Sequence, residues 1–141
     1  MLLLLVKVLL YGHVGLLIEI WFTALHSVIF LKDVKAPGRT YLWMIPIYGL
    51  AAIALGGLHA VLPRYLFIPL ALLFIYCAEA SAGLILKKLT GRIPWDYGSA
   101  KFGIAGLVRL DYAPFWLLAV ICFDRLSDYI TRILEIAGQL A

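Results

Sequence analysis

The sequence has little charge and few chemically reactive side chains. Its 141 residues include only 8 acidic and 12 basic ones, so 14% of the chain is charged. Soluble domains carry about 25% charged residues, and this composition is too poor in charge for an ordinary water-exposed surface. The two cysteines, Cys77 and Cys122, both lie in apolar runs, which argues against a disulfide framework and against a closely spaced metal pair. We interpret them as buried or lipid-facing thiols.

Signatures of several enzyme classes are missing as well. The sequence contains no HExxH motif, no phosphate-binding loop and no Ser/His/Asp arrangement, so hydrolase and kinase chemistry lack support. Three histidines are interpreted as interhelical hydrogen-bonding groups, because none has the spacing of a metal site. We therefore expect no metal and no cofactor, and we assign no catalytic residue. The net charge of +4 is spread over short segments, which suits anionic lipid head groups better than nucleic acid.

Apolar residues are what the chain has in excess. They make up 65% of the sequence, against about 45–50% in a soluble domain, and the mean hydropathy is +1.01. The pattern predicts one all-α transmembrane domain over residues 1–141, a multi-pass bundle of four helical spans. A polar, glycine-containing segment between spans three and four is predicted to form a structured interfacial or re-entrant loop. The predicted spans cover about 3–31, 41–62, 66–88 and 112–133, and the loop covers 89–111.

Small and polar residues form one stripe in the first predicted span. They recur at spacings of three and four residues, which places them on a single face of a helix. Such a stripe is typical of helix–helix contact in lipid. Its members are Gly12, Gly15, Glu19, Thr23 and His26.

Two acids, Glu19 and Glu79, lie near the middle of predicted spans one and three. An acid at mid-bilayer costs roughly 2.5–3.5 kcal/mol on insertion scales and usually faces a partner or a cavity. Odd-numbered spans run in the same direction, so the two carboxylates are expected to meet at similar depth. That pair could hold a cation, relay a proton or bind a polar ligand.

Basic residues predict the orientation in the membrane. Three cations lie in the first loop and five in or beside the third, whereas the second loop holds only Arg64. The positive-inside rule then places loops one and three on the cytoplasmic side of the cell membrane or inner membrane. The leading run Met1–Lys7 lacks the charged region and the cleavage site of a signal peptide, and we expect it to begin span one.

A family resemblance covers about residues 10 to 130. It rests on these segments in order: Gly12-His13-Val14-Gly15 with Glu19, Trp43 with Tyr48-Gly49, Glu79 with Gly83, Pro94-Trp95-Asp96-Tyr97, and Gly106 to Tyr112 with Trp116. In these the chain resembles the type IV ABC-transporter permease-like (CmpB-like) family of bacterial membrane proteins and its small vertebrate transmembrane relatives. The resemblance implies a polytopic membrane protein and a possible transport component. It also brings in His13 as a candidate site residue.

We predict that the chain binds a polar or ionic ligand at an intramembrane acidic site. Two other functions remain open: a membrane-embedded enzyme that acts on a lipid or isoprenoid head group, and a structural or partner-binding membrane subunit. Expected partners are the lipid bilayer, the ligand, and a second copy or a separate subunit, with no nucleic acid. The candidate ligand-binding residues are Glu19, Glu79, His13, Trp95, Asp96, Tyr97, Arg92 and Arg109.

Overall fold

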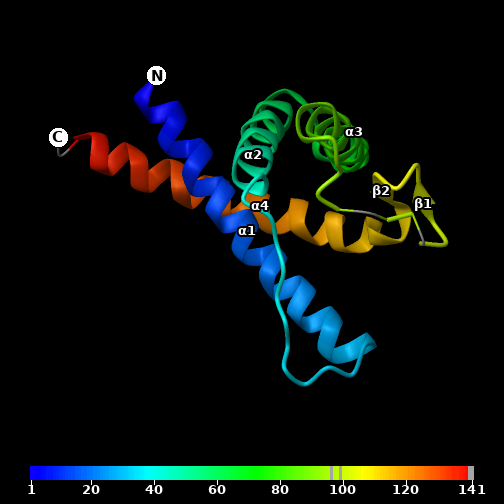
Figure 1. Cartoon of the computed structure of the whole chain (residues 1–141). Coiled ribbons are helices and arrows are strands. Elements are labelled where there is room, and N and C mark those ends of the chain that lie inside the picture. The colour runs from blue at the N-terminus through cyan, green and yellow to red at the C-terminus, as the bar shows by residue number, and fades with distance from the viewer. Residues whose placement is uncertain (96, 99, 140–141) are drawn as a thin grey trace. The chain divides into compact units, whose positions relative to one another are not determined.

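The structure is a computed structural model that describes residues 1–95, 97–98 and 100–139, without the side chains of residues 127, 128, 131 and 139. It is mostly helical, which confirms the predicted class, apart from a two-stranded antiparallel hairpin in the predicted loop (Figure 1). In chain order the elements are α1 (Leu2–Phe30), α2 (Met44–Val61), α3 (Arg64–Thr90), β1 (Gly103–Ile104), β2 (Val108–Arg109), the 3₁₀ helix η1 (Leu110–Tyr112) and α4 (Ala113–Gln139).

Helices α1, α2 and α3 are each long and apolar enough to cross a membrane. Many of their large apolar side chains are exposed, for example Trp21 at 68% and Leu73 at 58%. Removing apolar surface from water is favourable by about 25 cal/mol per Å². These exposed apolar side chains would therefore be unfavourable in water, and they suit contact with lipid. The chain is accordingly an integral membrane protein.

Helix α4 is not among these three helices in the part of the chain that the structure describes. Its first half is apolar, but charged residues begin at Asp124 and Arg125 and continue with Arg132 and Glu135. The predicted fourth span over 112–133 therefore stays a prediction. The helix itself runs further than predicted, to Gln139.

The chain divides into two compact units, Met1–Ala54 and Leu55–Ala141, which are described separately. In the first unit, glycines bring α1 against the start of α2. A Cβ on Gly12 would collide with the carbonyl oxygen of Ile45, and one on Gly49 would collide with that of Val8. The predicted small-residue contact between helices is confirmed at these positions, because only hydrogen fits between the two backbones.

The loop between α1 and α2 returns along α1. The Thr23 hydroxyl accepts a hydrogen bond from the Arg39 backbone N–H at 2.8 Å, and the Ser27 hydroxyl lies 3.4 Å from the Pro37 carbonyl oxygen. Buried Ser27 and the polar face of α1 thus satisfy backbone groups of the loop. This return brings Thr40 beside the middle of α1.

The second unit is built around the contact between α3 and α4. Its buried apolar residues include Phe67, Ala71, Ile75 and Val120, with Ala71 completely buried where α4 approaches. Figure 1 shows α3 close to end-on while α4 runs across the picture, so the two helices cross steeply. Helix α3 ends at Gly91, whose φ of 77° is the left-handed conformation in which glycine commonly ends a helix.

Candidate functional site

Glu19 is hydrogen-bonded within the first unit. The Thr40 hydroxyl donates to Glu19 Oε2 at 2.6 Å, and Tyr48 is a second side-chain partner of the same carboxylate. Gly15, one turn before Glu19, leaves room for the Tyr48 ring, since a Cβ there would lie 2.7 Å from that ring. The carboxylate thus joins α1 to the returning loop and to α2.

His13 is exposed and bonded to its own helix. Its Nδ1 lies 2.7 Å from the Leu9 carbonyl oxygen, four residues earlier. Glu79 belongs to the other unit, so the predicted meeting of Glu19 and Glu79 stays a prediction.

Glu79 lies on a face of α3 that the segment after α3 covers. Its Oε2 is shielded from solvent, and its charge acts on Tyr76 and Tyr112. The Tyr76 hydroxyl, one turn before Glu79, donates to the Leu110 carbonyl oxygen at 3.1 Å. Tyr76, Glu79 and Gly83 recur at spacings of three and four, so one side of α3 presents all three.

Arg109 forms the charged part of the covering segment. Its guanidinium binds Asp111 through two hydrogen bonds, Nε to Oδ1 at 3.0 Å and Nη2 to Oδ2 at 2.5 Å. The same group lies 4.1 Å from the Tyr112 ring centroid and donates to the Tyr112 hydroxyl at 3.0 Å. These contacts hold one cation, one anion and one phenol in a fixed arrangement.

Neighbouring charges and burial shift the pKa values of Asp111, Arg109 and Tyr112. The hydrogen bonds from Arg109 hold the pKa of Asp111 below its usual range, and in return Asp111 raises the pKa of Arg109. Burial raises the pKa of the Tyr112 phenol, and the negative charges of Asp111 and Glu79 add to that rise while Arg109 opposes it. Tyr112 therefore stays a neutral hydrogen-bonding group at physiological pH.

Trp95 closes the group on the side of Gly83. Its indole is buried, and Nε1 donates to the Leu107 carbonyl oxygen at 3.0 Å. A Cβ on Gly83 would lie 2.6 Å from Leu107 Cδ2 and 3.3 Å from Trp95 Cζ2, so this glycine lets the segment lie directly on α3. The Tyr97 ring meets the Tyr112 ring edge-on at 6.0 Å between centroids.

The structure therefore brings together four of the predicted site residues: Glu79, Trp95, Tyr97 and Arg109. Arg92 is exposed just after α3, and no side-chain contact links it to this group in the described residues. Asp96 lies outside the described residues, so its predicted pairing with an arginine stays a prediction.

Sequence reasoning did not include Tyr76, Asp111 and Tyr112 among the site residues. The order Arg109-Leu110-Asp111-Tyr112 could have indicated Asp111 and Tyr112. A strand that leads into a 3₁₀ helix brings a residue close to those two and three positions after it, here Arg109 to Asp111 and Tyr112. No spacing rule predicts that Tyr76 would reach a backbone carbonyl 34 residues later.

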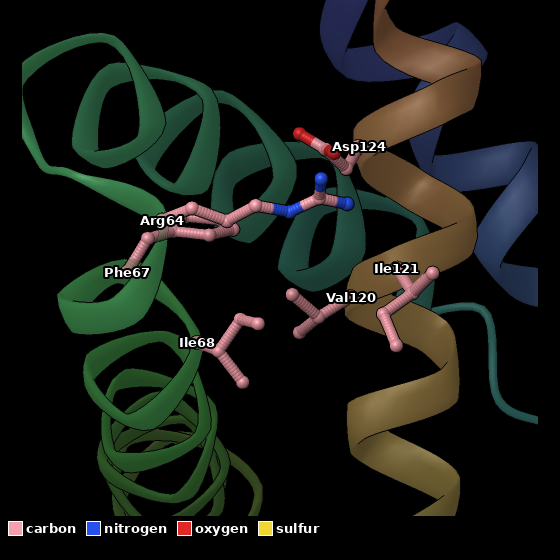
Figure 2. Close-up of a pocket in the computed structure, with 6 residues that line it drawn as sticks. All are labelled: Arg64, Phe67, Ile68, Val120, Ile121 and Asp124. Carbon is pink, nitrogen blue, oxygen red and sulfur yellow. The ribbon is translucent and has the colours of Figure 1, made fainter.

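A second polar group lies at the other end of α3. His59 Nε2 is 2.9 Å from Asp124 Oδ1, and a shallow pocket beside this pair is lined by side chains of α3 and α4. Figure 2 shows the Arg64 guanidinium reaching towards Asp124, with Phe67, Ile68, Val120 and Ile121 around the apolar part. Among the described residues, no three histidine, cysteine, aspartate or glutamate side chains gather as metal ligands.

The group around Glu79 combines acids, phenols and one arginine in a mostly apolar setting. Because Asp111 balances Arg109, the group carries a net negative charge when Glu79 is ionised. Carboxylate and phenol oxygens beside aromatic faces suit a cation or a polar hydrogen-bonding ligand.

Comparison with known families agrees with the resemblance seen in the sequence. The family described as "Putative ABC-transporter type IV" matches residues 6–140, which is nearly the whole chain. No solved structure matches the chain. The chain belongs to the family described as "Putative ABC-transporter type IV".

Proposed function

We propose that this chain is a transport-related membrane component that binds a polar or ionic ligand beside Glu79, with a small cation preferred. The observation that carries the proposal is the covered face of α3, where the charge of Glu79 acts on Tyr112, and Arg109 of the Arg109–Asp111 ion pair donates to the Tyr112 hydroxyl. An acidic side chain inside the membrane is energetically costly. Such residues usually pair with another group or serve a function. The negative balance of the group favours a cation over an anion.

A re-entrant loop would bring this group to the depth of Glu79. The bond from Tyr76 to Leu110 and the packing of Gly83 on Leu107 support a path in which residues 91–112 turn back along α3 towards its middle. Irregular backbone at such depth is tolerated where protein or water covers it, as in many transporter binding sites. With loops one and three in the cytoplasm, the ligand would enter this site from the cytoplasmic side.

Glu19 has a different role in this proposal. Its bonds to Thr40 and Tyr48 account for the carboxylate as a packing group of the first unit. Direct participation in ligand binding would require that it also reach Glu79. The mutational comparison below separates the two roles.

The other functions named at the start have less support. A lipid-modifying enzyme would need Arg92 and Arg109 as phosphate ligands, but Asp111 already occupies two donors of Arg109. As a transport component the chain would act together with an ATPase domain outside this sequence, because residues 1–141 contain no phosphate-binding loop.

A cation panel tests the proposal. Purified protein in nanodiscs is heated with alkali and alkaline-earth chlorides and small organic ammonium salts, and the melting temperature is compared for wild type, Glu79→Gln and Glu19→Gln. A ligand that binds only the native state raises the melting temperature. We expect at least one cation to stabilise wild type and Glu19→Gln but not Glu79→Gln. No shift in wild type, or an equal shift in Glu79→Gln, contradicts the proposal.

A further inference from the structure

We propose that the second half of α4, residues 124–139, lies in the membrane–water interface and binds the lipid surface with one apolar stripe. This inference is independent of the ligand at Glu79. It replaces a helical fourth span with a helix that lies along the bilayer surface.

The apolar stripe is exposed. Tyr129, Ile133 and Ile136 are 65%, 64% and 58% exposed, and they recur at spacings of four and three. At about 100° per residue they fall within about 60° of one another on one side of the helix. A narrow apolar stripe on a helix of low overall hydrophobicity is typical of an interfacial helix and not of a spanning one.

Charged residues occupy a neighbouring side of the same helix. Asp124, Arg132 and Glu135 fall within about 80° of one another, and the centre of this charged side lies about 110° from the centre of the apolar stripe. Arg125 lies between the two, where its aliphatic stem can lie along the boundary and its head can reach water. A helix that continued across the bilayer would have to bury all five charged residues of the segment.

The position of α4 on α3 sets its depth. Val120 packs near Ala71, which lies seven residues after Arg64, or about 10 Å along the helix at 1.5 Å per residue. Arg64 follows the two-residue turn between α2 and α3, and a turn between two spans must lie at the membrane surface. Interfacial helices lie about 5–10 Å into the head-group boundary, which fits this depth.

The steep crossing supports the same placement. If α3 runs along the membrane normal, α4 runs close to the membrane plane (Figure 1). The Asp124–His59 pair fixes the start of the amphipathic half at the level of the α2–α3 turn. Beyond Asp124 the exposed apolar stripe would then lie at the depth of the lipid head groups.

Apolar burial, and not charge, favours lipid as the occupant. The segment holds three acids and two arginines in its sequence, so it has no net positive charge to attract it to anionic lipid. Apolar burial alone should hold the stripe. We therefore expect its contact with the bilayer to persist in high salt.

Nitroxide scanning tests this placement. Single cysteines are introduced at 125, 126, 129, 130, 132, 133, 134 and 136 in a Cys77→Ala/Cys122→Ala background and labelled in neutral liposomes. Collision with oxygen reports lipid, and collision with a water-soluble nickel chelate reports solvent. Arg132→Cys is the matched control for Ile133→Cys, since both positions are exposed and adjacent.

We expect the two accessibilities to oscillate in opposite phase with a period of 3.6 residues, at constant mean depth, in low salt and in 0.5 M salt. A depth that grows by about 1.5 Å per residue along the segment overturns the proposal in favour of a spanning helix. Solvent access at every position means that the segment leaves the membrane, and exclusion of both reagents at 129, 133 and 136 means that protein covers the stripe. Either result also overturns it.

Discussion

Gly83 in α3 lies directly beneath Trp95 and Leu107, with space for a hydrogen atom and not for a methyl group. This contact sets how closely the segment after α3 approaches the Glu79 face. The closeness of that approach decides whether Arg109, Tyr112 and Glu79 can act as one group.

Replacing Gly83 tests this dependence. Gly83→Ala should displace Leu107 and the Trp95 ring, and overpacking of this kind costs about 1–3 kcal/mol. Gly56→Ala is the matched control, because nothing lies within 4 Å of the Cβ position of that mid-helix glycine. Both variants gain the same helix propensity of about 1 kcal/mol, so the difference between their melting temperatures isolates the contact. Equal melting temperatures would contradict the close packing.

Gly12 should be less tolerant still. The Cβ of Gly12→Ala would meet the backbone carbonyl of Ile45, which cannot rotate aside as the Leu107 side chain can. We expect Gly12→Ala to lose more stability than Gly83→Ala, by thermal unfolding in nanodiscs with Gly57→Ala as the control in open space. A Gly12→Ala protein as stable as wild type would mean that α1 and α2 are not in contact there.

Replacing Thr40 tests the structural role of Glu19. Thr40→Val keeps the shape of the side chain but removes the donor to Glu19, and a hydrogen bond to a charged group contributes about 1.5–3 kcal/mol. We expect a lower melting temperature and unchanged ligand response at Glu79. A lost ligand response with an unchanged melting temperature would instead place Glu19 in the binding site.

Acid should weaken the covering segment through Asp111. The pKa of this carboxyl is lowered in the folded state by Arg109, so its contribution to stability is present above its ordinary pKa of 3.8 and is lost as the pH falls through the lower folded value. The melting temperature of wild type should therefore fall more between pH 6 and pH 3 than that of Asp111→Asn. Parallel pH profiles would show that the ion pair contributes nothing.

Much of this architecture follows from sequence periodicity. Any long apolar run can face lipid, so such runs predict α1, α2 and α3. The spacing of Gly12 and Gly15 predicts the face of α1 that contacts α2. These features depend on residues that are close together in the chain, so the sequence pattern is enough to predict them.

The parts that escaped prediction are long-range or ambiguous. The contact of Tyr76 with Leu110 depends on how the hairpin folds back, which no spacing reports. The run from Ala113 to Phe123 is apolar enough to resemble the start of a span, although the helix then becomes amphipathic. Thr40, one partner of Glu19, comes from the loop returning along α1, whose course depends on the Thr23 and Ser27 hydroxyls.

The most direct test of the account asks whether the Glu79 carboxylate itself contacts the ligand. Difference infrared spectra are recorded as the stabilising cation is perfused over wild type, Glu79→Gln and Glu19→Gln protein in lipid films. We expect a shifted carboxylate band in wild type and Glu19→Gln that is absent from Glu79→Gln. The same difference band in Glu79→Gln would contradict the account.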